Sequence, residues 1–548
     1  MFRNLFLLFL ALFVVEAFAQ TADTRYFIAF TDKNNTPFAV SNPAQFLSPR
    51  AISRRIDQGI AITTTDLPVN PAYVDSLISK GATIHGVSKW LNGVVVNVSS
   101  AAQLAAIAAL PFVKSNTLVK ARLHGKSLSH KFEYSTVPAE IPSQETLYGA
   151  SYTQINMLNG LFLHEAGYKG GSKLIAVLDV GFSNVDSNNL LANTLANHHI
   201  LYTADIVDNQ TSVYEDPQHG AMVLSTMAAN NPYKYIGTAP EADYILLRSE
   251  DEHSETLVEE YYWAIAAEKA DSFGADLINS SLGYNEFDNN LANHTYADLN
   301  GTTTPAAIAA NLAQERGILV VVSAGNEGDH PWKRIGTPAD AIGIITVGAV
   351  QSDRSPAVFT SYGPSSDGRV KPDLASMGAL AAVIDNNGYI VKSNGTSFAS
   401  PILCGMAACL WQKHPLRTAA EVRSALIASA HLYHFPDNRE GYGIPDFRIA
   451  DIILNNPENP LLNQTHPPAI LGNPYGEQSS ILAYSVSAQT GNYKVYSVTG
   501  QLLFEKEFST SKETYTLISL SDLNFLSTGN YIIAVTINDS LHYLKLMK

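Results

Sequence analysis

Residues 173–180, KLIAVLDV, form a short apolar run that ends at a carboxylate, and this stretch decides the fold. Runs of the same kind alternate with helix-like segments further along the chain: the runs at 275–283, 318–325 and 341–350, and the helix-like segments at 256–274 and 305–317. Strands that are buried on both faces have such continuous apolar sequences, and an intervening helix makes consecutive strands parallel. We therefore expect an α/β domain over residues 141–455, in which helices cover both faces of a parallel sheet.

The segments on either side of this region have other patterns. Residues 20–140 combine alternating strands such as TRYFIAF with the helix-like AAQLAAIAAL, which predicts a small α+β domain. Residues 456–473 are rich in Asn and Pro and are typical of a linker. Residues 474–548 alternate polar and apolar side chains between turn signals, which predicts a small all-β sandwich.

The first 19 residues, MFRNLFLLFLALFVVEAFA, have the three parts of an export signal. Arg3 precedes an apolar run over residues 5–15, and residues 17–19, Ala-Phe-Ala, form a small-x-small cleavage site. The alternative, a membrane anchor, needs about 20 apolar residues, and this run is shorter. We expect a secretory signal peptide on residues 1–19, and hence a protein that is secreted or held at the cell surface.

The composition limits the classes of function. The chain of 548 residues has 35 Lys and Arg against 50 Asp and Glu, a formal charge of −15, and it has no long basic run. Nucleic acid is therefore not an expected partner. The two cysteines, Cys404 and Cys409, lie five residues apart on one expected helix, where a disulfide would be strained. We expect two free, buried thiols.

A serine in the stretch NGTSFASP, residues 394–401, is a candidate nucleophile. Ser397 follows a Gly-Thr turn and opens a helix, whose N-terminal partial positive charge favours an anion beside the hydroxyl. Helix capping is the competing interpretation, because Thr and Ser side chains satisfy the free amides at helix starts. Taken alone, this serine is better explained as a cap.

Asp179 and His219 change that balance. Asp179 lies near the end of the run at 173–180, and His219 opens the helical pattern HGAMVLSTMAAN. Each alone has a plainer explanation, but an Asp, a His and a Ser at the edges of regular elements in one domain supply the roles of acyl transfer. Ser397 attacks, His219 carries the proton, and Asp179 orients and stabilises the imidazolium. Asn326 ends another buried run, and although it is also explained as a turn residue, its amide is suited to bind the oxyanion.

Together these motifs resemble those of the subtilisin-like serine proteases, peptidase family S8. The matching stretches lie in the family's order between residues 175 and 401: IAVLDVGF, HGAMVLSTMAA, INSSLG, VVVSAGNEG, DGRVKPDLASMG and NGTSFASP. The resemblance implies an edge that pairs with the substrate backbone and an opposite wall of the P1 pocket, formed by Ser281, Leu282 and Gly283 and by Ser323, Ala324 and Gly325 respectively. It implies broad specificity, with large apolar P1 residues accepted.

Two positions depart from the family pattern. Val180 stands where the family usually has Ser or Thr after the Asp, and Ala221 stands where it usually has Thr after His-Gly. Both changes remove a hydroxyl near the triad, but neither removes a reacting group. We expect activity to be altered and not abolished.

The flanking segments fit the same resemblance. LSPRAISRR and SKWLNGVVVNV, within residues 20–140, resemble the propeptides of exported subtilases, which assist folding and block the active site. We expect a zymogen that is cleaved in the polar connector between about residues 120 and 147. The C-terminal NYIIAVTINDSLHYLKLMK resembles the sorting domains that Bacteroidetes use for type IX secretion, with an ordinary accessory β domain as the alternative. The expected partners are polypeptide substrates, the chain's own propeptide as inhibitor and the secretion machinery, and we expect a monomer.

The expected chemistry requires no cofactor and no metal. Subtilases often bind structural calcium, for which Asp186, Asp205 and Asp208 are the candidate ligands, with solvated surface aspartates as the alternative. A catalytically silent subtilisin-like surface protein that binds polypeptides is the second hypothesis, disfavoured because all four catalytic positions are filled. A serine esterase of the α/β-hydrolase type is disfavoured because the chain has no GxSxG elbow and its triad order differs.

Overall fold

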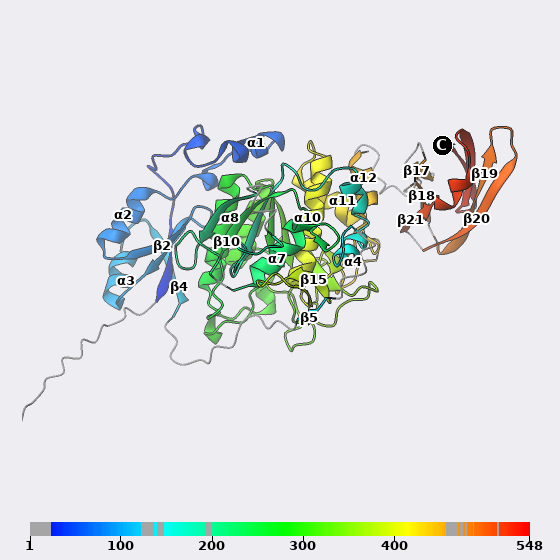
Figure 1. Cartoon of the computed structure of the whole chain (residues 1–548). Coiled ribbons are helices and arrows are strands. Elements are labelled where there is room, and N and C mark those ends of the chain that lie inside the picture. Colours follow the sequence, from blue (N-terminus) through cyan, green and yellow to red (C-terminus); the bar gives the residue numbers. More distant parts are fainter. Residues whose placement is uncertain are drawn as a thin grey trace, which may run out of the picture.

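The chain folds into three units in sequence order, which we call the N-terminal unit (24–121), the α/β unit (147–455) and the C-terminal unit (468–548) (Figure 1). The computed structural model describes residues 24–121, 136–139, 147–191, 199–215, 217–433, 435–455, 468–471, 475–476, 479–485, 487–511 and 514–548. The expected signal peptide and most of the expected activation region and linker lie outside these residues.

The N-terminal unit is a small α+β structure, as expected. Its four strands form an antiparallel sheet in the order β2-β3-β1-β4, and three helices accompany it. The elements are β1 (Arg25–Phe30), α1 (Pro49–Asp57), α2 (Pro71–Ser79), β2 (Thr83–Ser88), β3 (Gly93–Asn97), α3 (Ala101–Ala108) and β4 (Val113–Lys120). Each helix begins at a side chain that accepts a hydrogen bond from a free amide, namely Ser48, Asn70 and Ser100. Ile28, Leu77 and Ile107 are fully buried in its core.

A seven-stranded sheet in the order β14-β13-β12-β11-β6-β10-β7 forms the centre of the α/β unit, and all of its neighbouring strands run parallel. Its strands are β6 (Leu174–Asp179), β7 (Ile200–Asp205), β10 (Asp243–Arg248), β11 (Leu277–Ser280), β12 (Leu319–Ser323), β13 (Ile345–Val350) and β14 (Leu374–Met377). The helices are α4 (Tyr152–Asn156), α5 (Leu161–Glu165), α7 (His219–Ala228), α8 (Val258–Phe273), α9 (Pro305–Glu315), α10 (Thr396–Lys413), α11 (Ala419–Ala428) and α12 (Phe447–Asn455).

Helices cover both faces of this sheet, which confirms the expected fold class. Alternate residues of β6 enter two separate cores, and every residue of the strand is buried. Ile175 and Val177 pack with α7 and α10 on one face, whereas Ala176 and Leu178 pack with α8 and α9 on the other. The continuous apolar sequence is therefore a consequence of burial on two sides. Cys404 and Cys409 are both free and buried in α10, as expected.

Short strands complete the α/β unit. A three-stranded sheet joins β15 (Ala381–Ile384), β16 (Ile390–Ser393) and β5 (Val137–Pro138), and a two-stranded one joins β8 (Asn230–Asn231) and β9 (Tyr235–Ile236). Strand β15 contacts both α7 and α10, β9 contacts α7, and β16 leads into α10.

The C-terminal unit is an all-β sandwich, in orange and red in Figure 1. One sheet contains β17 (Ala469–Leu471), β18 (Ser480–Ser485) and β21 (Thr514–Ser519), and the other contains β20 (Leu502–Thr510), β19 (Gln489–Ser497), β22 (Asn530–Ile537) and β23 (Ser540–Met547). Ile481, Val495 and Ile533 are fully buried between the sheets. Across the described parts of the chain, no helix is both long enough and apolar enough to cross a bilayer.

Candidate active site

The carboxyl ends of three neighbouring parallel strands bring the predicted site residues to one edge of the sheet. Asp179 is the last residue of β6, Ser281 follows β11, and Asn326 lies three residues beyond β12. The register pairs Ser280 of β11 with Leu178 on one side and Val322 on the other. Helices α7 and α10 begin at this same edge, with His219 and Ser397 in their first turns. Sites in open α/β sheets form at such edges.

Asp179 and His219 are joined by a short, buried hydrogen bond. The Nδ1 atom of His219 lies 2.7 Å from Oδ1 of Asp179, and the two residues are 2% and 0% exposed. The same carboxylate oxygen accepts a hydrogen bond of 2.9 Å from the amide of Val180. Gly220 permits the close approach of α7, because a Cβ there would lie 2.3 Å from the carbonyl oxygen of Gly181. A carboxylate bound to Nδ1 fixes the tautomer of the imidazole, with Nε2 left as the base.

Ser397 lies beside this pair at the start of α10. The ring of Phe398, the next residue, has its centroid 6.1 Å from that of His219. Ser397 is 6% exposed, and among the described residues its hydroxyl makes one hydrogen bond, a long one of 3.5 Å to the carbonyl oxygen of Ser281. The first turn of α10 is fixed by the Ser281 hydroxyl, which donates to the carbonyl oxygen of Ser397 at 2.8 Å. Hydrogen bonds of a nucleophile are often loose before substrate binds.

Asn326 is held so that its amide nitrogen is directed away from the protein framework. Its Oδ1 accepts two hydrogen bonds from Thr396, from the backbone amide at 2.9 Å and from the hydroxyl at 3.0 Å. Because both groups donate, the atom that they contact must be the oxygen of the side-chain amide. The NH₂ group of Asn326 is therefore on the opposite side, away from Thr396. Asn326 is exposed, and Thr396, to which it is bonded, directly precedes Ser397. This is the arrangement that an oxyanion donor requires.

The two predicted substrate-binding segments lie on either side of these groups. Ser281 and Leu282 have buried side chains, whereas Gly283 is exposed. In the described part of the chain, no hydrogen bond joins the backbone of Leu282 or Gly283 to another group. An unpaired extended edge of this kind can add a substrate strand. In the opposite segment, Ser323 is the last residue of β12, and Ala324 and Gly325 follow it; Ser323 and Ala324 are buried, whereas Gly325 is half-buried.

Gly325 has a conformation that other residues rarely adopt. Its φ is +101°, and a Cβ would lie 2.8 Å from the hydroxyl of Ser361. Its amide also donates to the hydroxyl of Thr396 at 3.1 Å, so the Gly325 turn and Asn326 are fixed by the same threonine. This role of Thr396 was not predicted, although its place directly before Ser397 was a usable signal.

One carboxylate oxygen at the site has no hydrogen bond. Oδ2 of Asp179 is buried and without a partner among the described residues. The two positions where the sequence departs from the family pattern, Val180 and Ala221, are both buried and offer no hydroxyl there. An unsatisfied buried acceptor costs about 1–3 kcal/mol. Val180 and Ala221 therefore leave the reacting groups in place but offer no hydroxyl that could donate to the Asp179 carboxylate.

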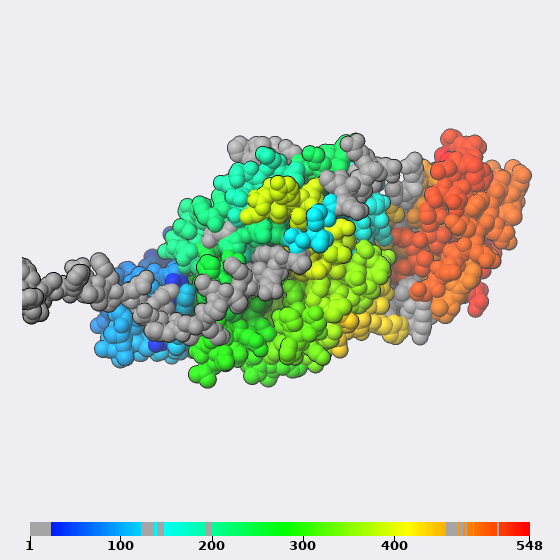
Figure 2. Space-filling view, turned by 60° about the horizontal axis from the view of Figure 1, so that its bottom comes forward, coloured from blue at the N-terminus to red at the C-terminus, as the bar shows by residue number. Residues whose placement is uncertain are grey.

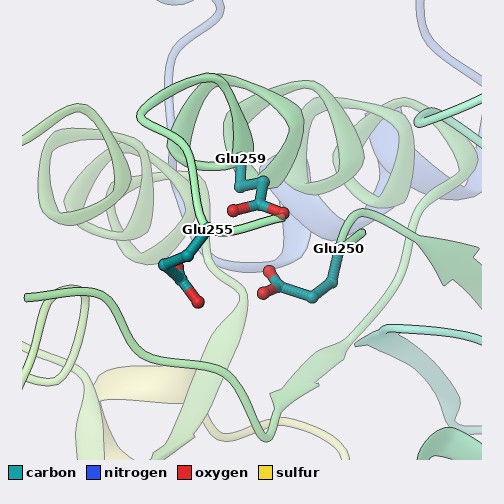
Figure 3. A group of neighbouring side chains, drawn as sticks. All are labelled: Glu250, Glu255 and Glu259. Carbon is teal, nitrogen blue, oxygen red and sulfur yellow. The ribbon is translucent and has the colours of Figure 1, made fainter. Parts of the chain in front are cut away.

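A second group of acidic residues was also missed. Glu250, Glu255 and Glu259 bring their carboxylates within 4.8 Å of one another (Figure 3). The sequence signal was available, because the stretch 250–260, EDEHSETLVEE, contains six carboxylates.

The three calcium candidates do not form one cluster. Asp205 and Asp208 both bind the guanidinium of Arg248, at 2.9 and 2.6 Å, and Asp186 is exposed elsewhere. Arg248 thus supplies positive charge to two of the three carboxylates. Calcium binding stays a prediction from the resemblance.

Comparison with known proteins gives two matches that together span most of the first two units. The model of the subtilase family, peptidase family S8, matches residues 170–443, and that of the S8 propeptide domain of Bacteroidota matches residues 25–134. Subtilisin NAT of Bacillus subtilis subsp. natto is 32% identical over 282 residues, which cover 50% of this chain and 65% of that protein. Subtilisin of Bacillus pumilus is 32% identical over 282 residues, 50% of this chain and 90% of that protein.

The chain therefore spans about two thirds of the length of subtilisin NAT. Among solved structures, MycP1 from Mycobacterium smegmatis is similar, with a TM-score of 0.45 and 20% identity over 59% of this chain and 89% of that one.

Proposed function

The chain belongs to the subtilase family, and on that premise we propose that it is a secreted serine endopeptidase that is made as a zymogen. The observation that carries this proposal is the buried hydrogen bond of 2.7 Å between His219 and Asp179. His219 is the first residue of α7, and Ser397 lies in the first turn of α10. A silent binding protein has no need of a buried, oriented imidazole beside a serine.

In the proposed reaction, Oγ of Ser397 attacks the carbonyl carbon of the scissile peptide bond while its proton passes to Nε2 of His219. Asp179 stabilises the imidazolium that results, and the amide of Asn326 donates to the oxyanion. The imidazolium then gives the proton to the leaving amine as the C–N bond breaks. Water hydrolyses the acyl ester by the same steps in reverse order, and the free serine is restored.

We further propose that the N-terminal unit, which matches a propeptide domain, inhibits the enzyme before activation. Its sheet packs on α8, where Phe27 stacks on Tyr261 with ring centroids 4.4 Å apart. Trp90 and Val119 of this unit share a hydrophobic core with α8 and the sheet. Figure 2 shows the blue N-terminal unit directly against the green part of the α/β unit. An interface of this kind supports a propeptide that folds with the protease and stays bound to it.

The substrate is proposed to be a polypeptide with a large apolar residue at P1. The small side chains of Ser323, Ala324 and Gly325 support a roomy pocket, and the unpaired backbone of Leu282 and Gly283 supports recognition that does not depend on sequence. Equal cleavage of peptides with acidic and with apolar P1 residues would contradict this assignment.

Export and sorting are proposed from the sequence. Residues 1–19 support a signal peptide, and the β-sandwich of the C-terminal unit supports a domain read by secretion machinery of type IX. The product would be secreted or held at the cell surface, as a monomer. Purification of an active form that still begins at Gln20 would contradict activation between about residues 120 and 147.

The decisive experiment treats the mature protein with a serine-directed phosphonate and separately with casein. A protease is labelled at Ser397 and degrades casein, and Ser397→Ala loses both properties while it keeps its thermal unfolding midpoint. A form that is folded but neither labelled nor active would favour the polypeptide-binding protein. The same preparation tests calcium, because a chelator lowers Tm if the ion is structural and leaves Tm unchanged if it is not.

A further inference from the structure

The substrate-binding edge leads directly into a long loop, residues 285–304, which ends at helix α9. Immediately after Gly283, the backbone of Tyr284 exchanges two hydrogen bonds with that of Thr337, at 2.8 and 3.0 Å. The hydroxyl of Thr337 is in turn hydrogen-bonded to that of Thr304, the last residue of the loop. One threonine therefore fixes both ends of the loop, and the position of the edge depends on how the loop between them is held.

His294 attaches the middle of this loop to a buried carboxylate. Its Nε2 atom lies 2.5 Å from Oε1 of Glu260, which is in the first turn of α8 and is 0% exposed. The other oxygen of Glu260 accepts a hydrogen bond of 3.1 Å from the amide of Ala306, in the first turn of α9. The backbone amide of His294 donates to the carbonyl oxygen of Asn285 at 2.9 Å. Through His294, the residue two positions beyond Gly283 is thus connected to both helices.

The ring of His294 is packed among acidic groups. It meets the ring of Phe287 edge to face, with centroids 5.3 Å apart, and 12% of its side chain is exposed. The charged groups around it are Glu260 of α8, Asp298 of the same loop, and Asp340, which precedes β13. Burial acts to lower the pKa of His294, but the hydrogen bond to Glu260 and these negative charges outweigh it and raise the pKa above its usual value. The protonated imidazole is therefore the form that this packing stabilises.

Loss of the proton would weaken this contact without removing it. A neutral imidazole can still donate from Nε2, whereas a hydrogen bond that involves ionised groups is about twice as strong as a neutral one. The buried carboxylate of Glu260 would keep its hydrogen bonds and lose the positive charge beside it. Because the pKa of His294 is raised in the folded protein, the added stabilisation is complete below pH 6.5 and is lost as the pH rises through that raised pKa.

We propose that His294, together with Glu260, is a positioning residue for the substrate: its imidazolium holds the loop 285–304 and so keeps the edge of Leu282 and Gly283 in the conformation that pairs with a peptide. The inference rests on the proposed protease function, and it adds that substrate affinity depends on the protonation of a residue outside the triad. Pairing with this edge stabilises the bound substrate and the transition state alike. A looser edge should therefore raise KM and leave kcat nearly unchanged.

The test measures kcat and KM of the mature enzyme, prepared from the full chain, with a peptide that is blocked at both ends and has Phe at P1 and no ionisable group. In the wild type we expect KM to rise about 3-fold to 10-fold between about pH 6 and about pH 9, as the weakening of one charge-assisted contact would cause. Protonation of His219 acts on kcat, because the base must be neutral. His294→Gln should have the raised KM at every pH, because its amide donates a hydrogen bond that carries no charge.

His199→Gln is the matched control. His199 also pairs with a carboxylate, since its Nδ1 atom lies 3.0 Å from Oδ1 of Asp243. Asp243 is the first residue of β10 and therefore lies at the edge of the sheet opposite the site. This variant should keep the wild-type KM at each pH. The two variants each remove one histidine–carboxylate pair, and only one of these pairs holds the loop that follows the substrate-binding edge.

The outcomes separate the two proposals. If no peptide is cleaved at any pH, the protease function fails. If peptides are cleaved and the KM of the wild type is constant over this range, the positioning role of His294 is refuted, and this measurement does not depend on the folding of any variant. A KM that rises with pH equally in His294→Gln would assign the pH dependence to another group and would also refute the role. A lower Tm in His294→Gln with kcat and KM unchanged would show a purely structural contact and would equally overturn the inference.

Discussion

A buried ion cluster between the propeptide and the protease converges on one carboxylate, and its removal gives a quantitative prediction. Asp271 of α8 is 0% exposed and receives three basic side chains of the N-terminal unit. Arg54 lies 2.5 Å away, Arg55 2.7 Å and Lys89 2.9 Å, between charged atoms. Burial acts to raise the pKa of this carboxyl, but Lys89, Arg54 and Arg55 outweigh it and hold the pKa well below the usual range. We consider the substitution Asp271→Asn.

The expected weakening of inhibition follows from the charges that the substitution leaves unpaired. Arg54 and Arg55 are 5% and 1% exposed, so loss of the carboxylate leaves buried guanidinium groups without their main counter-charge. Breaking a buried pair in this way costs about 3–5 kcal/mol. At about 1.4 kcal/mol for each factor of ten, inhibition by the propeptide should weaken between about a hundredfold and a few thousandfold. The mature enzyme should be little affected, because all three partners belong to the propeptide.

The assay measures the inhibition constant of the isolated propeptide, added to mature enzyme of each kind. Asp353→Asn is the matched control, since it removes a charge from an exposed aspartate that bonds to Ser355. We expect the control and the wild type to have equal inhibition constants, and Asp271→Asn to keep its kcat/KM towards peptides. An inhibition constant that changes less than threefold would refute the idea that this ion cluster stabilises the complex.

Three further predictions concern the catalytic unit. Asn326→Ala should lower kcat about a hundredfold to a thousandfold with little change in KM, the effect known for loss of such a donor in subtilisins, as steady-state kinetics would show. Val180→Thr should raise Tm, because a hydroxyl that reaches Oδ2 of Asp179 gains about 1 kcal/mol, whereas a fall in Tm would mean that the hydroxyl finds no acceptor. Burial lowers the pKa of His164 to about 4, so its contribution to stability is present above pH 6.5 and is lost as the pH falls towards 4. Urea unfolding should show a loss of about 3 kcal/mol over that range, and His164→Gln should flatten it.

The parallel sheet was predictable because a strand that is buried on both faces must be apolar at nearly every position. Every residue of β6 is buried, with alternate side chains in two cores, and only a run such as LIAVLD satisfies both faces. The position of Asp179 at the carboxyl end followed from the same run. The partners of these groups were not predictable, because they come from remote segments that only the folded chain brings together. Thr396 fixes Asn326 across 70 residues, and the acidic run at 250–260 gave no sign that Tyr284 links it to the substrate edge.

One helix connects two separate contacts with the propeptide. Helix α8 spans 16 residues, or about 24 Å, and the propeptide contacts both of its ends. At the C-terminal end, Asp271 binds Arg54 of α1, and near the N-terminal end the loop that carries Asp251 binds Lys120, the last residue of β4 in the same folded unit. Cleavage beyond Lys120 cuts neither contact, so a cleaved propeptide remains bound through both and its release needs a further event. The lag before full activity should therefore be shorter in Asp271→Asn than in the wild type, because one of the two contacts is weakened.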